Sequence, residues 1–127
     1  MLCSEIVGWR GDDVRKVIIM IGDEESKYAM DGIIAGIVRP FNMTCLTKLD
    51  KYYDNEYTYY TQQLRYDYPS FGQIRKLREE TKTDIIFLST NKKLQWFKDA
   101  SKFIQNTDKN VAAYTDGDVE AIIEQQV

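Results

Sequence analysis

A short apolar run, from Lys16 to Asp23, constrains the fold of this chain more than any other stretch. Its apolar residues follow one another without alternating with polar ones, which predicts a β-strand buried on both faces, as in a parallel sheet. Because burying a carboxylate is costly, Asp23 is expected where the strand emerges, at its carboxyl end. Ligands bind at that edge of open α/β sheets, and a carboxylate there suits Mg²⁺ or Ca²⁺. The alternative interpretation is a solvated acid in a turn.

Composition narrows the class of protein. A chain of 127 residues suffices for one domain with a hydrophobic core. The net charge of −3 does not favour nucleic acid or anionic membranes as partners. No apolar run is long enough to span a bilayer, and the first residues lack the segments of a signal peptide.

The residues available for chemistry are few. The chain has no histidine, which excludes histidine-based catalytic triads and histidine-ligated zinc. The two cysteines, Cys3 and Cys45, are too few for a four-cysteine zinc site. By themselves they leave open one disulfide or two buried thiols.

Hydrophobic periodicity predicts an alternating α/β order. Strands are expected at 16–22, 84–89 and 111–114, and helices after Pro69, at 92–105 and at 118–126, with Pro69 able to occupy a first helical turn. Two segments show no clean period: 26–40, expected to be irregular with an extended piece near 33–38, and the tyrosine-rich 50–68, expected to be a long surface loop. This order predicts a parallel sheet with flanking helices in one domain, residues 1–127. The first strand then lies at a sheet edge, which indicates that a neighbour belongs beside it.

Three short motifs have ordinary alternatives. Asn42-Met43-Thr44 fits the N-glycosylation acceptor pattern, which has meaning only in a secreted chain. Arg10-Gly11-Asp12 is read as a plain turn before the first strand. The tyrosines of 50–68 either form a recognition surface or only anchor the loop to the body.

Together, several motifs resemble one known family. They are Cys3 to Arg10, the strand ending in Asp23, Asp31-Gly32 with the following Ala35 to Pro40, Cys45, Asp67-Tyr68-Pro69-Ser70 and the strand at 85–88. The chain resembles the C-terminal half of the integrin β-subunit I-like domain, which is a von Willebrand A-type domain. The resemblance extends from about residue 2 to 125.

The resemblance implies an adhesion function without catalysis. Asp23 would be one ligand of a Mg²⁺ site whose remaining ligands lie outside this chain, and a backbone carbonyl near Thr115 or Asp116 would serve an adjacent Ca²⁺. Cys3 and Cys45 would form a disulfide, and Asn42 would carry a glycan, on the extracellular side of the cell membrane. Membrane attachment would come from other parts of the receptor. The partners would be an integrin α subunit and an extracellular matrix or cell-surface protein, and the helix at 118–126 would shift to couple the metal site to a neighbouring domain.

The chain departs from the family pattern at three places. Ile33 stands where the family usually has a lysine or arginine that inserts into the α subunit, so an apolar anchor is expected at that interface. Glu24 and Glu25 add negative charge beside Asp23. The loop between Cys45 and Asp67 is longer than usual and rich in tyrosine.

Two other functions compete with adhesion. A free-standing Mg²⁺-dependent phosphoryl-transfer protein would use Asp23 as nucleophile or metal ligand, with Ser89-Thr90 and Thr115-Asp116 at the other strand ends. A secreted, metal-free A-type interaction module is the other alternative.

Overall fold

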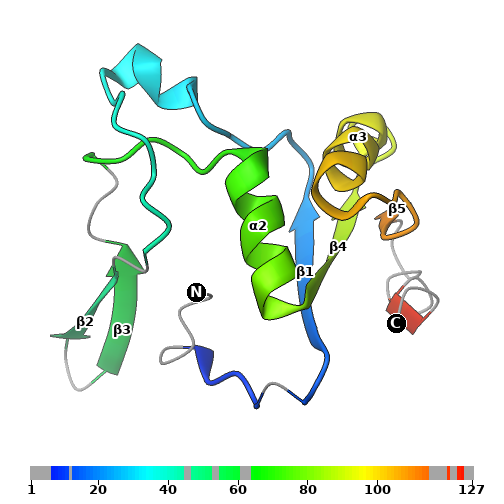
Figure 1. Ribbon diagram of the computed structural model, residues 1–127, viewed down its shortest axis with the longest axis horizontal. Coiled ribbons are helices and arrows are strands. Elements are labelled where there is room, and N and C mark those ends of the chain that lie inside the picture. The colour runs from blue at the N-terminus through cyan, green and yellow to red at the C-terminus, as the bar shows by residue number, and fades with distance from the viewer. Residues whose placement is uncertain are drawn as a thin grey trace.

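A three-stranded parallel sheet forms the centre of the molecule (Figure 1). The computed structural model describes residues 7–11, 13–44, 47–52, 55–60, 64–114, 120 and 123–124. Strands β1 (Lys16–Gly22), β4 (Thr83–Ser89) and β5 (Val111–Ala113) lie in the order β1-β4-β5, and both pairings are parallel. The predicted α/β class, with the first strand at an edge, is confirmed.

Strand β4 carries the hydrophobic core. Ile86 and Leu88 are almost completely buried, and Ile85 and Phe87 pack with residues of both neighbouring helices, α2 (Phe71–Thr81) and α3 (Leu94–Gln105). Since alternate strand residues share a face, both helices cover the same side of the sheet. Both helices were predicted from their periodicity, and α2 has the expected three turns.

Helix α2 begins two residues later than a helix with Pro69 as its first residue would. Its N-cap is Ser70, whose hydroxyl accepts the Gln73 N–H, while the Gln73 side chain accepts the Ser70 N–H. Two of the N–H groups left without partners at a helix start are thereby satisfied. Pro69 therefore precedes the cap instead of lying in the first turn.

The side chain of Gln105 hydrogen-bonds to the backbone of β4 at Ile85, which precedes the residues of β4 that pair with β5. The Gln105 amide donates to the Ile85 carbonyl and accepts the Ile85 N–H, both at 2.8 Å, and it also donates to the Ser101 hydroxyl. All of these groups are buried. Gln105 thus supplies the hydrogen bonds that a longer neighbouring strand would have made.

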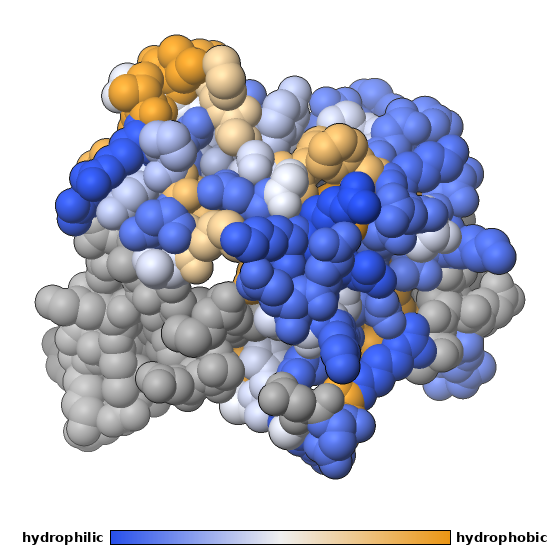
Figure 2. Space-filling view, in the orientation of Figure 1, coloured by the Kyte–Doolittle hydropathy of each residue, from blue (hydrophilic) through white to orange (hydrophobic). Residues whose placement is uncertain are grey.

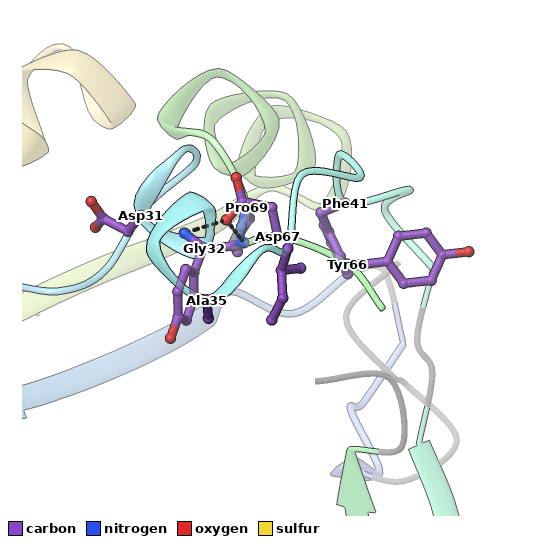
Figure 3. A pocket seen from close by; sticks show the side chains of 9 residues that line it. Asp31, Gly32, Ala35, Phe41, Tyr66, Asp67 and Pro69 are labelled. Carbon is purple, nitrogen blue, oxygen red and sulfur yellow. Dashed lines mark hydrogen bonds between the residues drawn. The ribbon is translucent and has the colours of Figure 1, made fainter. Parts of the chain in front are cut away.

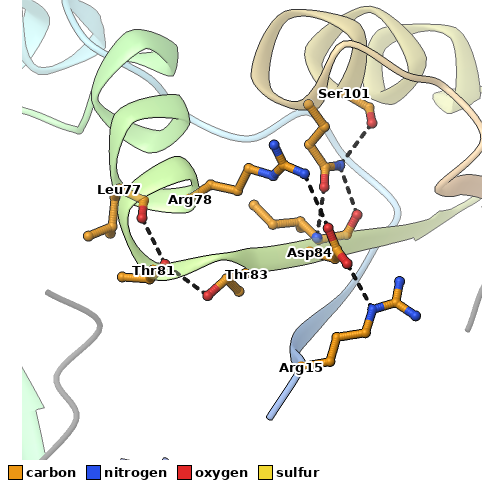
Figure 4. Close-up of polar contacts among 9 residues, drawn as sticks. Arg15, Leu77, Arg78, Thr81, Thr83, Asp84 and Ser101 are labelled. Carbon is orange, nitrogen blue, oxygen red and sulfur yellow. Dashed lines mark hydrogen bonds and ion pairs between the residues drawn. The ribbon is translucent and has the colours of Figure 1, made fainter. Parts of the chain in front are cut away.

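An ion-pair group joins the beginnings of β1 and β4 to helix α2 (Figure 4). Asp84 accepts Arg15 Nε at 2.9 Å and Arg78 Nη2 at 3.2 Å. Partial burial raises the pKa of Asp84, but the hydrogen bonds and charges of the two arginines outweigh it and hold that pKa below its usual value.

Burial of β1 on both faces was predicted wrongly. Ile19, Met20 and Ile21 are 41–62% exposed. The reason is the edge position: β1 pairs with β4 on one side, and within the described residues no strand pairs with it on the other. An uninterrupted apolar run predicts a strand that is covered on both faces, and here part of the strand's apolar surface is exposed to solvent.

Two predicted irregular segments contain regular structure. Strands β2 (Thr47–Tyr52) and β3 (Asn55–Tyr60), which begin shortly before and continue into the segment 50–68, form an antiparallel hairpin. The hairpin lies apart from the main sheet in Figure 1. Aromatic and β-branched residues favour strands, and the interleaved polar residues concealed that preference. Instead of an extended piece near 33–38, the chain forms the 3₁₀-helix η1 (Asp31–Ala35), bounded by Met30 and Gly36 in left-handed conformations.

Several predictions fall outside the described residues. They concern Cys3, Asp12, Cys45, Asp116 and most of the expected helix at 118–126. In the part of the chain that the structure describes, no helix has the length and apolarity required to cross a membrane.

Replacing Gln105 with leucine should destabilise the protein by about 1–3 kcal/mol, because the buried N–H and C=O of Ile85 lose their partner. Chemical denaturation would measure this as a lower midpoint. The matched control is Gln95→Leu, since Gln95 is an exposed α3 residue whose side-chain amide donates a hydrogen bond to the exposed Asp99. We expect the control to change stability by less than about 0.5 kcal/mol. Equal effects of both substitutions would contradict the backbone role of Gln105.

Candidate functional site

Asp23 lies at the carboxyl edge of the sheet, as predicted. It follows β1 directly and is exposed. Gly22 pairs with Ser89 at the end of β4, so the loops after both strands begin at the same edge. This is the position at which open α/β sheets bind ligands.

The two acids after Asp23 bind a lysine. Lys93, just before α3, contacts Glu24 at 3.0 Å and Glu25 at 3.2 Å. The hydrogen bond from Lys93 lowers the pKa of Glu24, and the bonds to Glu24 and Glu25 raise the pKa of Lys93. Lys93 therefore offsets part of the extra negative charge beside Asp23.

The described residues do not make a cation site by themselves. Among them, no three carboxylate, thiol or imidazole side chains gather closely enough to hold a metal ion. Mg²⁺ requires about six oxygen ligands, and Asp23 offers a single carboxylate. A site that uses Asp23 therefore needs oxygen ligands other than a cluster of the described carboxylates.

Asn42 lies exposed on the segment that leads from η1 to the hairpin. Its carbonyl oxygen accepts the Thr44 hydroxyl at 2.7 Å and the Thr44 N–H at 3.2 Å. The acceptor asparagine and the hydroxyl of its motif are thus in contact on an accessible surface.

A second candidate region is an exposed apolar turn, defined here as residues 28–38. Met30 is 68%, Ile34 97% and Val38 69% exposed, and Ile33 is 47% exposed. Figure 2 shows apolar surface concentrated over the 3₁₀-helix at one corner of the molecule. Exposed apolar side chains that lie together in this way typically mark an interaction surface.

One buried carboxylate holds this turn. Asp67 accepts three backbone N–H groups: Met30 at 2.6 Å, Gly32 at 2.9 Å and its neighbour Tyr68 at 2.8 Å. Figure 3 shows Asp67 bonded to Gly32. The bond from Met30, followed by those from Tyr68 and Gly32, lowers the pKa of Asp67 despite the opposing effect of burial. Asp67 is therefore a charged acceptor that satisfies the start of η1.

Further contacts fix the turn to the beginning of α2. The Asp67 N–H donates to the Arg39 carbonyl at 2.8 Å, and the Ala29 N–H donates to the Pro69 carbonyl at 3.2 Å. Gln73, which also caps α2, donates to the Phe41 carbonyl at 2.6 Å. The segment 67–73 thus contacts the chain both before η1, at Ala29, and after it, at Arg39 and Phe41.

A cavity of about 390 Å³ adjoins this contact. Its walls combine backbone, aromatic and acidic groups from the turn and from the segment before α2: Asp31, Gly32, Ala35, Ile37, Phe41, Tyr66, Asp67, Tyr68 and Pro69.

Sequence reasoning placed Ile33 at an interface but missed the roles of Ile34 and Asp67. Ile33 is indeed exposed, yet Ile34 projects further into solvent. Asp67 was noted only as part of the Asp67-Tyr68-Pro69-Ser70 motif. Its contacts lie 35 and 37 residues away along the chain, so no local pattern could reveal them.

The parallel sheet with its flanking helices is that of a partial von Willebrand A-type domain. The sequence profile described as "Integrin beta chain VWA domain" matches residues 1–127, and the chain belongs to this integrin beta family.

Named relatives agree with this assignment. Integrin beta pat-3 of Caenorhabditis elegans is 30% identical over 111 residues, 87% of this chain and 13% of the relative. Integrin beta-6 of Ovis aries is 28% identical over 122 residues, 96% of this chain and 14% of the relative. Integrin beta-PS of Drosophila melanogaster is 29% identical over 122 residues, with coverage of 96% and 13%. The chain thus spans about one seventh of the length of these relatives.

Replacing Gly32 with alanine should destabilise the protein by about 1–3 kcal/mol, because the added Cβ would lie 2.5 Å from Asp67 Oδ1 and 2.8 Å from the Ile37 carbonyl. Thermal denaturation would show a lower midpoint. At Gly72, in the first turn of α2, the nearest atom to an added Cβ is 3.8 Å away. Gly72→Ala should therefore be neutral or slightly stabilising. A neutral Gly32→Ala would contradict the close approach.

The stabilisation by Asp67 should depend on pH. Because its pKa is lower in the folded protein than the ordinary 3.8, folding favours the charged form. The stabilisation is complete above the ordinary value and is lost as pH falls through the lower, folded-state value. Denaturation of wild type and Asp67→Asn across pH 2–7 should therefore show a wild-type advantage at about pH 6–7 that shrinks below about pH 4. An advantage that grows on acidification would refute this assignment.

Proposed function

We propose that this chain is part of the head domain of an integrin β subunit, a cell-surface adhesion receptor that binds extracellular protein ligands and performs no catalysis. The observation that carries the proposal is the family match over residues 1–127, together with Asp23 directly after β1. Mg²⁺ would take one ligand from Asp23, and an adjacent Ca²⁺ would take a carbonyl near Thr115 or Asp116. The remaining ligands would come from beyond the described residues. A cation held there supplies positive charge for an acidic side chain of the protein ligand.

Pairing with an α subunit is assigned to the apolar turn. Ile33 occupies the position expected to contact the α subunit, and Ile34 beside it is almost fully exposed. Burying an isoleucine side chain contributes about 1.5–3 kcal/mol, so two neighbouring anchors could contribute substantially to pairing without a charged residue.

An extracellular location at the cell membrane accompanies this function. The accessible Asn42–Thr44 motif supports glycosylation at Asn42. A disulfide between Cys3 and Cys45 is proposed from the family resemblance and fits an oxidising compartment.

A phosphoryl-transfer enzyme receives less support from the structure. Ser89, the hydroxyl residue at the end of β4, is completely buried and cannot meet a substrate in this conformation. Lys93, a cation near this edge, is engaged with Glu24 and Glu25.

Asp23→Ala in the full-length receptor should abolish divalent-cation-dependent adhesion, because it removes the carboxylate at the carboxyl edge. Cells expressing wild type are first tested on a panel of coated extracellular matrix proteins, and a protein whose attachment is lost in EDTA becomes the probe. Receptor at the surface is quantified by flow cytometry. Asp99→Ala, which removes an exposed acid from α3, is the matched control and should retain adhesion. Undiminished adhesion of Asp23→Ala at normal surface expression would refute the cation role.

A further inference from the structure

The apolar turn is a short element with a strained start. Helix η1 has five residues, too few for an independently stable helix, and the side chain of its N-cap residue, Met30, makes no capping hydrogen bond. Met30 has φ of 86°, a left-handed conformation that is uncommon for residues other than glycine. Local backbone bonds, such as that from the Gly36 N–H to the Ile33 carbonyl, are supplemented by contacts from elsewhere in the chain.

Asp67 provides the contacts that the turn lacks. Oδ2 accepts the Met30 N–H, and Oδ1 accepts the Gly32 N–H together with that of Tyr68. The carboxylate thus satisfies donors on both sides of the 30–31 peptide, where the chain changes from left-handed to 3₁₀ conformation. A negative charge beside N–H groups at a helix start is also electrostatically favourable.

Asp67 lies directly against the backbone of the turn at Gly32, where an added Cβ would be 2.5 Å from its Oδ1. Asp67 is 9% exposed, and Gly32 is buried directly against its carboxylate. Ile33 and Ile34 of η1 are exposed, whereas Asp67 is buried, so the carboxylate supports the backbone that carries the exposed side chains.

We propose that Asp67 is the positioning residue of the α-subunit docking surface: it fixes the backbone of the turn so that Ile33 and Ile34 are presented to the partner in one orientation. This inference rests on the pairing role proposed above. Asp67 itself lies beneath the turn and makes no direct contact with the partner. Its effect on pairing is transmitted through the Met30 and Gly32 amides.

Asparagine at position 67 tests this geometry with almost no change in side-chain size. It has one oxygen in place of two. With that oxygen at the Oδ1 position, its amide N–H₂ would face the Met30 N–H, donor against donor. With the amide reversed, the Gly32 and Tyr68 N–H groups would lose their acceptor. Either orientation releases at least one end of the contact that holds the turn.

The experiment uses the full-length β chain. Wild type is co-expressed with each integrin α subunit of its own genome, and the subunit with which it reaches the cell surface becomes the probe. Four variants are then compared: Asp67→Asn, Gly32→Ala, Ile33→Glu, and Asp108→Asn as the charge-matched control. Asp108 is paired with Lys102 after α3, far along the chain from the turn. Heterodimer yield is measured by gel filtration and amide hydrogen exchange by mass spectrometry.

The proposal predicts a specific combination of results. Asp67→Asn and Gly32→Ala should each accelerate exchange in residues 28–38 at least tenfold more than they accelerate exchange in β4 and α3, and should reduce heterodimer at least tenfold. Ile33→Glu should reduce pairing equally without altering exchange, because it changes the contact surface and not its support. Asp108→Asn should resemble wild type in both measurements.

Other outcomes distinguish the positioning role of Asp67 from the docking surface itself. If Asp67→Asn loosens the turn but pairs within twofold of wild type while Ile33→Glu does not pair, Asp67 is not a positioning residue and the docking surface stands. If Ile33→Glu pairs normally, the docking surface itself is refuted. If Asp67→Asn and Gly32→Ala accelerate exchange in β4 as much as in residues 28–38, the role of Asp67 is general to the fold and the proposal is overturned.

Discussion

The burial of β4 is the constraint on which the rest of this structure depends. It pairs with β1 on one side and β5 on the other, Ile86 and Leu88 are almost completely buried, and the face that carries Ile85 and Phe87 receives both helices. Because every buried backbone group needs a partner, Gln105 completes the ladder where β5 is too short. The parallel order that results places the ends of β1 and β4 at one edge, and this is what brings Asp23 to a position suited to ligand binding.

The two candidate sites rest on different kinds of support. At the carboxyl edge, Asp23 is positioned by the end of strand β1. The two acids that follow it pair with Lys93 in a surface ion-pair group. The apolar turn has no regular element of sufficient length to support it. It relies on hydrogen bonds to one buried carboxylate and on close backbone contact at Gly32.

Membership of the integrin beta family gives these two regions a common interpretation. Under the proposed function, the carboxyl edge would face a ligand and a cation, and the apolar turn would face a partner subunit. These two roles require surfaces of different chemistry on one small domain. The exposed β1 residues fit the same view, because an apolar strand edge is normally covered in a complete sheet. Exposure of Ile34 is likewise costly unless a partner covers it. Surfaces that appear unfavourable in the isolated chain are thus the ones at which further protein would pack.

The sequence by itself determined the α/β order, the edge position of β1, the placement of Asp23 and both helices, because each of these follows from local hydrophobic periodicity or from the cost of burying charge. Local pattern misread the hairpin, since the polar residues between its tyrosines resemble a loop, and it misread η1, whose conformation depends on Asp67. Only the tertiary structure revealed the contacts of Asp67 with Met30 and Gly32, the replacement of strand bonds by Gln105, and the greater exposure of Ile34. The hydrogen bonds of Asp67 and Gln105 join residues 20 to 37 positions apart. Hydrogen bonds across such separations, like the exposure of one side chain, are specified by how the chain packs and not by any pattern along it.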